Sequence, residues 1–270
     1  MINLVSVENV SKAFGEHVLF EGISFGINEG QKIGFVAKNG SGKSSLLNII
    51  TKINSSDTGQ VVYRKGLKVA FLSQEPDLDD KLTIEETIFT GDNESLKAIA
   101  QYEQAMLNPE DADAFQAAFD KMDQEQAWDF ETQYKQVLSK LKLDNLALKV
   151  ESLSGGQKKR LALANVLLSN PELVFLDEPT NHLDLEMIEW LEDYFAKEKI
   201  TLFMITHDRY FLENVCNEIV ELDQGQLYNY KGNYAYYLEK KEMRLATEAT
   251  ELAKSKQLFK KELDWMRRQP

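Results

Sequence analysis

The sequence predicts an α/β fold in which a largely parallel sheet forms the core, with a β-rich segment before it and a helical segment inserted into it. Three observations carry this prediction. Short β-branched and apolar runs alternate with helical patterns, a glycine-rich loop joins a strand to a helix, and the composition supports a sizeable core. The 270 residues are 43% apolar and 28% charged, so folding can bury on the order of 70–75% of the unfolded surface.

The first 74 residues are expected to be mostly strands separated by glycine-containing turns. β-branched and apolar residues gather in the runs 4–10, 23–27, 32–36, 60–63 and 67–72. A helical pattern at 43–51 interrupts these runs directly after a glycine-rich loop. The segment therefore contains a strand, a glycine loop and a helix in that order.

Residues 83–150 are expected to form the inserted helical segment. Thr83 and Glu86 match a capping box, acidic helical stretches follow, and Asn108 with Pro109 marks a break. After this segment, the runs 171–176, 201–206 and 218–222 read as buried strands that alternate with helices. That alternation is typical of a parallel sheet with crossover connections.

The C-terminal residues predict one long helix from Tyr237 onward, outside the globular core. A narrow apolar stripe repeats every seven residues, as a partner helix would require, at Leu238, Leu245, Leu252, Phe259 and Met266. Residues 231–270 hold ten Lys or Arg against six Asp or Glu, a net +4. Because the whole chain carries −13, the rest carries −17. A basic tail on an acidic body suggests two separate roles and excludes a surface coated in nucleic acid all over.

The sequence also indicates the cellular compartment of the protein. No run approaches the roughly 18–20 apolar residues that would cross a bilayer, so we expect no membrane insertion. Residues 1–14 lack the basic start and small-residue cleavage site of a signal peptide. A single cysteine, Cys216, cannot form an internal disulfide. These features predict a cytoplasmic protein.

The glycine-rich loop has the composition of a phosphate-binding loop. Its residues are Ala37, Lys38, Asn39, Gly40, Ser41, Gly42, Lys43 and Ser44. Small residues let backbone N–H groups close around phosphate oxygens, while Lys43 reaches the outer phosphates and Ser44 ligates Mg²⁺. The usual first glycine is Ala37 here. If that position needs a positive φ, alanine costs about 1–2 kcal/mol; otherwise the position tolerates a Cβ.

Two further motifs carry chemistry. Asp177 and Glu178 follow the buried run 173–176, and the carboxyl ends of such strands are where open α/β sheets place their ligands. An Asp there can hold Mg²⁺ through water while the Glu orients an attacking water. The second motif opens an apolar helix, so that its serine can cap the helix and its glycines can expose N–H groups to an anion. It consists of Leu153, Ser154, Gly155, Gly156 and Gln157.

Together these motifs resemble those of the ATP-binding cassette family of P-loop NTPases, over residues 1 to about 230. Gln74 resembles the glutamine that meets Mg²⁺ and the attacking water, His207 the histidine that contacts the γ-phosphate, and Phe14 the aromatic that stacks on adenine. The resemblance implies an ATPase that uses ATP and Mg²⁺. It implies catalysis by Glu178, His207 and Gln74, and metal contacts by Ser44, Gln74 and Asp177. It implies cofactor binding by Phe14, the loop residues 37–44 with Ser45, residues 153–157, and Asp184.

Residues 176–184, 206–212 and 230–238 resemble the soluble F branch of that family, and its Uup-like subgroup in particular. The branch implies two cassettes joined by a helical linker, acting on ribosomes. Residues 1–232 would then form one cassette, and 233–270 the start of a linker that stops before a second cassette. Since the family binds ATP between the loop of one cassette and the 153–157 motif of another, this chain alone would complete neither site and hydrolyse ATP weakly or not at all.

The linker helix is expected to contact RNA. Its basic residues are Lys240, Lys241, Arg244, Lys254, Lys256, Lys260, Lys261, Arg267 and Arg268. Two alternatives stay open: an ATP-binding subunit of a membrane transporter, and a DNA-binding repair ATPase. Co-purification with a permease would indicate the first. Binding to branched DNA without ribosomes would indicate the second.

Overall fold

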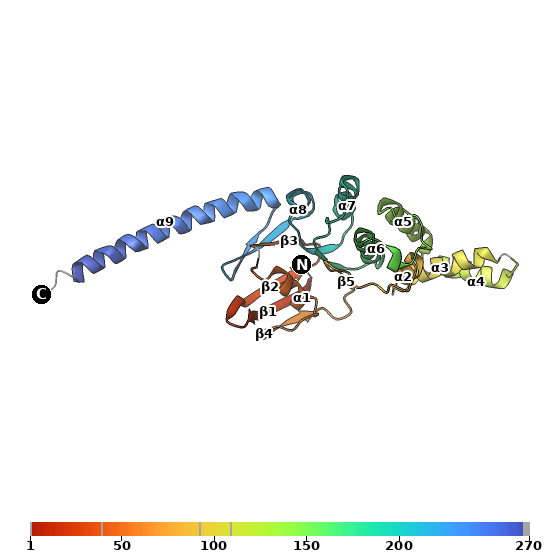
Figure 1. Ribbon diagram of the computed structural model, residues 1–270, viewed down its shortest axis with the longest axis horizontal. Coiled ribbons are helices and arrows are strands. Elements are labelled where there is room, and N and C mark those ends of the chain that lie inside the picture. The colour runs from red at the N-terminus through yellow and green to blue at the C-terminus, as the bar shows by residue number, and fades with distance from the viewer. Residues whose placement is uncertain (1, 39, 92, 109, 267–270) are drawn as a thin grey trace.

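The computed structural model describes residues 2–38, 40–91, 93–108 and 110–266, and these form the α/β architecture that the sequence predicts (Figure 1). An antiparallel sheet of order β2-β1-β4 packs beside a larger sheet of order β5-β6-β7-β3-β8-β9, in which only β9 is antiparallel to its neighbour. The smaller sheet contains β1 (Asn3–Phe14), β2 (His17–Asn28) and β4 (Thr58–Tyr63). The larger contains β3 (Lys32–Ala37), β5 (Val69–Leu72), β6 (Leu173–Asp177), β7 (Thr201–Ile205), β8 (Glu218–Asp223) and β9 (Gln226–Tyr230).

The larger sheet is buried on both faces, which explains the continuous apolar runs of its central strands. Every residue of β6 and β7 is buried. Alternate residues enter different cores, because successive side chains of a strand point to opposite faces. Phe175 packs with α1 (Lys43–Ile50) and the antiparallel sheet, whereas Val174 and Leu176 pack with the helices of the other face. Those helices include α6 (Gly155–Leu168), α7 (Leu185–Lys197) and α8 (Arg209–Val215).

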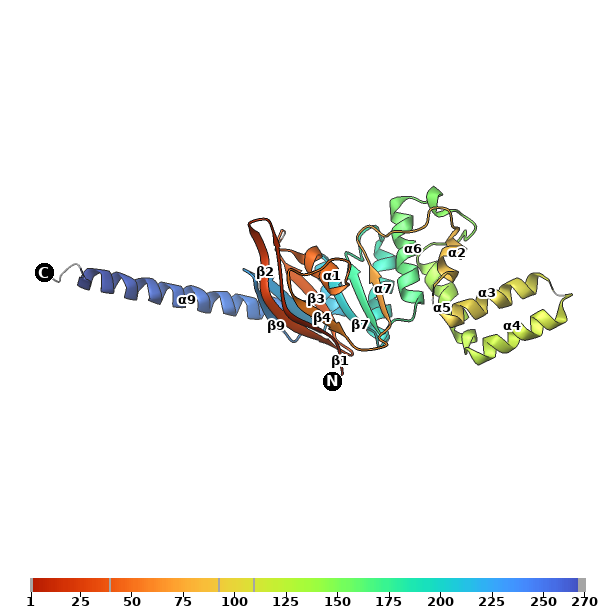
Figure 2. The same cartoon turned by 90° about the horizontal axis from the view of Figure 1, so that it is seen from below.

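The inserted segment between β5 and α6 is helical, as the sequence predicts. It contains α2 (Ile84–Phe89), α3 (Glu94–Leu107), α4 (Ala112–Gln124), α5 (Ala127–Lys140) and the short 3₁₀ helix η1 (Val150–Ser152). The expected capping box is present: Thr83 Oγ1 accepts from the Glu86 N–H at 3.1 Å, and Glu86 accepts from the Thr83 N–H at 2.7 Å. Asn108 ends α3, and Pro109 lies outside the described residues. The α3–α4 hairpin extends away from the body (Figure 2).

The C-terminal helix α9 (Tyr234–Met266) projects from the opposite side of the molecule (Figures 1 and 2). It begins three residues before the predicted start. The expectation that it lies outside the cassette core is wrong for its first turns, because Tyr237 is only 2% exposed and belongs to the main core. The Tyr237 hydroxyl donates to Glu221 Oε1 at 3.1 Å, so a buried polar partner fixes this end.

Helix α9 keeps the predicted apolar stripe in solvent along its described length. Leu238, Leu245, Leu252 and Phe259 are all exposed, while the side chain of Met266 lies outside the described residues. None of the helices in the described part of the chain combines the length and apolar character that spanning a membrane requires.

Candidate nucleotide-binding site

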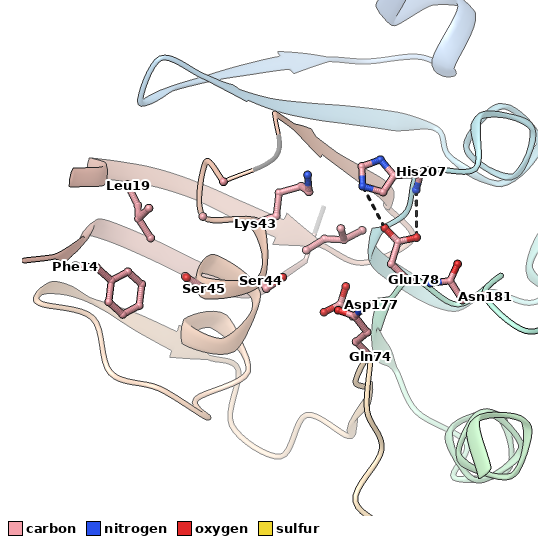
Figure 3. A pocket seen from close by; sticks show the side chains of 13 residues that line it. Phe14, Leu19, Lys43, Ser44, Ser45, Gln74, Asp177, Glu178, Asn181 and His207 are labelled. Carbon is pink, nitrogen blue, oxygen red and sulfur yellow. Dashed lines mark hydrogen bonds and ion pairs between the residues drawn. The ribbon is translucent and has the colours of Figure 1, made fainter. Parts of the chain in front are cut away.

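A pocket of about 620 Å³ opens at the carboxyl ends of β3 and β6, where the sequence places its phosphate loop and its paired carboxylates (Figure 3). All of the predicted catalytic and metal-binding residues line it. The lining residues are Phe14, Leu19, Gly40, Gly42, Lys43, Ser44, Ser45, Gln74, Asp177, Glu178, Asn181, Ile205 and His207.

The glycine loop takes left-handed backbone conformations at Gly40 and Gly42, with φ of +78° and +95°. A Cβ on Gly42 would lie 3.1 Å from the side chains of Leu19 and Phe20, so this position requires glycine. Ala37, by contrast, is the last residue of β3 and has no positive φ. The position of the missing glycine therefore tolerates a Cβ, and the loop carries no strain from that replacement.

The loop leads into the N-terminus of α1, which faces the pocket through Lys43, Ser44 and Ser45. No side chain of the described residues caps this terminus, and its first turn contains no acidic residue. The positive end of the helix dipole therefore faces the pocket, where it would stabilise an anion. The local backbone favours phosphate binding.

Lys43 lies at the centre of the pocket. Its Nζ donates to the Ala37 carbonyl at 2.9 Å, which holds the ammonium inside the loop. Burial lowers the pKa of Lys43, and the nearby charges of Glu178 and Asp177 act against that shift. A cation therefore lies between the loop and the carboxylates, where a polyphosphate could bridge the two.

Asp177 ends β6 and is 6% exposed. Burial raises the pKa of Asp177, and the charge of Glu178 raises it further, against the opposing effect of Lys159 and Lys43. A divalent cation would relieve this unfavourable charge. The Ser44 hydroxyl and the Gln74 amide line the same pocket, and oxygen donors of these kinds are the ligands that Mg²⁺ prefers.

Glu178 adopts a left-handed conformation, with a φ of +50° that is unusual for a residue other than glycine. Its N–H donates to the Ile205 carbonyl at 2.8 Å, and its Oε2 accepts from the His207 N–H at 3.3 Å. Its Oε1 lies 3.6 Å from His207 Nε2. These contacts turn the carboxylate toward His207, at the end of the pocket beyond Lys43 (Figure 3).

Phe14 lies at the other end of the pocket, together with Leu19 (Figure 3). The ring is 62% exposed and comes from the last residue of β1. An exposed aromatic face at a pocket rim can stack on a planar ligand. The pocket is therefore aromatic and apolar at one end and ionic at the other.

Several predicted cofactor-binding residues lie outside this pocket. Ala37, Lys38 and Ser41 belong to the loop without being lining residues, and Asn39 lies outside the described residues. Asp184 caps α7 by accepting from the Met187 N–H at 3.0 Å, and it pairs with Lys142 at 2.6 Å.

The motif at 153–157 is also outside the pocket, at the N-terminus of α6. Ser154 caps the helix as expected, accepting from the Gln157 N–H at 3.3 Å, and Gln157 Oε1 accepts in return from the Ser154 N–H at 2.9 Å. Gly155 is exposed, with open space where a Cβ would be. This helix end is accessible from outside the chain.

Sequence reasoning missed three lining residues. Asn181 follows Glu178 in a turn closed by the Asn181 N–H and the Glu178 carbonyl at 3.3 Å, and its place within the family-like segment 176–184 was a usable signal. Leu19 reaches the pocket through the β1–β2 pairing, and Ile205 through its position at the end of β7. Only the three-dimensional register reveals those two.

Comparisons with known proteins agree with this geometry. The family model described as ABC transporter matches residues 20–181, and a second model of the same description matches 220–270. The chain is 42% identical to the "Uncharacterized ABC transporter ATP-binding protein YfmR" of Bacillus subtilis, over 99% of this chain and 44% of that protein. It is 36% identical to the "Energy-dependent translational throttle protein EttA" of Mycobacterium tuberculosis, over 98% and 48% of the two chains. The chain thus spans about half the length of these relatives.

A solved structure shares the fold. It is described as a dimeric, post-hydrolysis state of an ATP-binding cassette bound to ADP and Pi, and it superposes with a TM-score of 0.58 at 24% identity, covering 84% of this chain and 98% of the other. The family match over residues 20–181 covers more than half of the chain and contains the loop and the carboxylates of the pocket. The chain therefore belongs to the ABC transporter family of ATP-binding cassette proteins, which are generally ATPases.

Proposed function

We propose that the chain is an ATP-binding and ATP-hydrolysing cassette. The observation that carries this proposal is the convergence of Lys43 and Ser44 with Asp177, Glu178 and His207 in one pocket. These side chains come from segments far apart in the sequence and provide a cation, a hydroxyl, two carboxylates and an imidazole. Phosphoryl transfer depends mainly on such positioning and on charge stabilisation.

Each part of the pocket has a proposed task. Phe14 stacks on adenine, the loop N–H groups hold the phosphates, and Lys43 pairs with the outer phosphates. Ser44, Gln74 and Asp177 would hold Mg²⁺, which neutralises charge on the phosphates when bound. Glu178 accepts a hydrogen bond from the attacking water and takes its proton, while His207 donates to the γ-phosphate.

We infer that the 153–157 motif and Asp184 serve a second cassette. The motif lies at the N-terminus of α6 with Gly155 exposed, and none of its residues lines the pocket of this chain. The dimeric state described for the structural relative supports this inference. Residues 1–232 would form one cassette and 233–270 the start of a linker to the other. A verified monomer of this chain should then hydrolyse ATP much more slowly than a two-cassette protein that contains it.

We propose that such a two-cassette protein belongs to the F branch and acts on ribosomes in the cytoplasm. The name of EttA, a translational throttle protein, supports this proposal. The exposed part of α9 supports it too, because Lys254 and Lys256 lie in solvent beside the apolar stripe. A second candidate is the ATP-binding subunit of a transporter, which the family description and the name of YfmR favour. Co-purification with a permease, and not with ribosomes, would decide for the transporter.

The Glu178→Gln substitution tests the catalytic assignment in the two-cassette protein. It keeps the shape of the side chain and removes the charge that accepts the proton, so hydrolysis should fall about 100- to 10,000-fold. ATP binding should stay within about twofold, and the variant should co-sediment with ribosomes in ATP. Glu29→Gln, an exposed residue outside the pocket, is the matched control. Near-normal hydrolysis in Glu178→Gln would exclude Glu178 as the base.

A further inference from the structure

Helix α6 carries a lysine in a row of otherwise apolar, buried side chains. Lys159 is 4% exposed, and the residues four and eight positions further along the same helix face, Leu163 and Leu167, are 1% exposed. Both leucines belong to the core that also contains Val174 and Leu176 of β6. Burial removes water from the Lys159 ammonium and lowers its pKa. Burying a charge in this way is unfavourable unless opposite charges lie nearby.

The opposite charges are those of the paired carboxylates. Lys159 Nζ donates to the main-chain carbonyl of Asp177 at 3.5 Å, so the ammonium lies at the end of β6. The charges of Asp177 and Glu178 act against the fall in the pKa of Lys159, and the charge of Lys159 acts against the rise in the pKa of Asp177. Lys159 is not one of the residues that line the pocket. It therefore acts on the carboxylates from the side of α6, through Asp177.

Lys43 is a second cation beside these carboxylates, and it differs from Lys159 in what it can reach. Lys43 lines the pocket together with Asp177 and Glu178 (Figure 3), where the outer phosphates of a nucleotide are proposed to pair with it. Because Lys159 is buried, it remains beside Asp177 whether or not a nucleotide is bound. By formal charge the two lysines balance the two carboxylates in the nucleotide-free chain. Phosphates that pair with Lys43 add negative charge to the pocket, and a divalent cation is then attracted more strongly.

We propose that Lys159 is a positioning residue of the metal site. Acting through Asp177, its charge lowers the affinity of the nucleotide-free pocket for a divalent cation, so that the cation binds together with the nucleotide. Ser44 and Gln74 have neutral side chains, so Asp177 supplies the charge of the proposed Mg²⁺ ligands, and a cation beside it opposes the metal directly. This inference rests on the proposed nucleotide binding in the pocket.

A purely structural role for Lys159 predicts the opposite result. If the lysine only holds the end of β6 in place, its loss displaces Asp177 and weakens metal binding. If its charge opposes the metal, its loss strengthens metal binding, and a nucleotide without metal binds less tightly because the pocket becomes more negative. The signs of these two changes therefore distinguish the two roles.

Titration of the nucleotide-free chain with Mn²⁺, followed by the free-ion signal in electron paramagnetic resonance, measures the first change. Mn²⁺ takes the same oxygen ligands as Mg²⁺. Lys159→Gln removes the charge and keeps a donor for the Asp177 carbonyl, whereas Lys159→Met removes both. Each variant should bind Mn²⁺ about three- to tenfold more tightly than the natural chain. Lys158→Gln, which removes the neighbouring charge that pairs with Asp80, is the matched control and should leave the Mn²⁺ affinity unchanged.

Adding Asp177→Asn tests whether the effect arises at the proposed metal site. In this background Lys159→Gln should no longer raise the Mn²⁺ affinity, because the charged ligand is gone. Calorimetry in EDTA measures the second change. Metal-free ADP should bind Lys159→Gln about two- to fivefold more weakly than the natural chain.

One comparison needs no variant and therefore does not depend on how well the variants fold. In the natural chain, Mn²⁺ should bind the ADP-saturated form at least about tenfold more tightly than the nucleotide-free form, and equal affinities would overturn the proposal. If the chain binds ADP but the Mn²⁺ affinity of both Lys159 variants is unchanged or lower, the role of Lys159 is wrong while nucleotide binding stands. If the chain binds no ADP at all, the proposed function fails, and this inference fails with it.

Discussion

Asp177 is a buried carboxylate beside a second carboxylate, and this placement gives the site a measurable pH dependence. Burial first, and then the charge of Glu178, raises the pKa of Asp177 in the fold. In the unfolded chain the pKa is about 3.9. The protonated form is therefore favoured by folding, and this contribution is fully present below the unfolded pKa and lost as the pH rises through the folded pKa.

Asp177→Asn removes this dependence, because the amide is neutral at every pH. Thermal melts of the nucleotide-free chain should show a higher Tm for the variant at pH 7. The increase should be about 2–4 °C for each kcal/mol by which the free energy of unfolding rises. The difference should close as the pH falls toward 4. A variant that is less stable than the natural chain at pH 7 would show that burial of this charge is not unfavourable.

Single residues also show what could be predicted from the sequence. Lys43, Ser44, Gln74, Asp177, Glu178, His207 and Phe14 all line the pocket. The loop and the paired carboxylates could be predicted from their motifs, whereas Gln74, His207 and Phe14 were predicted only from the family resemblance. The conformation of Ala37 could not be predicted, because the same residue would suit a strand end or a strained turn. Lys38 and Asp223 are 185 residues apart, and only the β3–β8 register brings them together.

At the scale of elements, the start of α9 is anchored in the core, whereas the apolar stripe of its later turns is exposed to solvent. The buried Tyr237 ring and its bond to Glu221 fix the start. Tyr237→Ala should lower the free energy of unfolding by about 3–5 kcal/mol, because it leaves a cavity and an unsatisfied partner. Denaturant titration should show this loss, whereas Tyr236→Ala, at a 40% exposed neighbour, should change stability by less than about 1 kcal/mol. Equal effects would mean that the start of α9 is not part of the core.

The sequence predicted α9 as a helix but not its anchorage. The seven-residue stripe follows from spacing alone, and it is exposed as predicted. The basic residues were harder to interpret, because charge patterns do not show burial. Lys241 and Arg244 pair with Glu221 and are occupied within the chain. Lys254 and Lys256 stay exposed, the side chains of Lys260 and Lys261 are not described, and Arg267 and Arg268 lie outside the described residues.

Four lysines of α9 carry the ribosome prediction. Replacing Lys254, Lys256, Lys260 and Lys261 with Glu in the two-cassette protein should weaken co-sedimentation with ribosomes, and should lower the salt slope by on the order of one unit for each lost phosphate contact. The matched control makes the same charge change on the body, at Lys65, Lys68, Lys81 and Lys199. If binding and its salt slope stay unchanged in the first variant, these lysines do not contact RNA.

At the scale of the whole molecule, the pocket and the 153–157 motif lie apart, and we propose that each is one half of a nucleotide site. The pocket holds the loop and the carboxylates, while the N-terminus of α6 offers the 153–157 motif elsewhere on the surface. Helix α9 and the α3–α4 hairpin extend from opposite sides of the body (Figures 1 and 2).

Nucleotide binding at the pocket is the claim on which this whole arrangement depends, and titration of the chain with MgATP in a calorimeter tests it most directly. The Glu178→Gln chain should bind one MgATP per chain. Adding Lys43→Ala, which removes a charged phosphate contact, should weaken binding at least about tenfold, whereas adding Lys65→Ala at an exposed position should leave it unchanged. No heat of binding, or equal affinity with and without Lys43, would contradict the account.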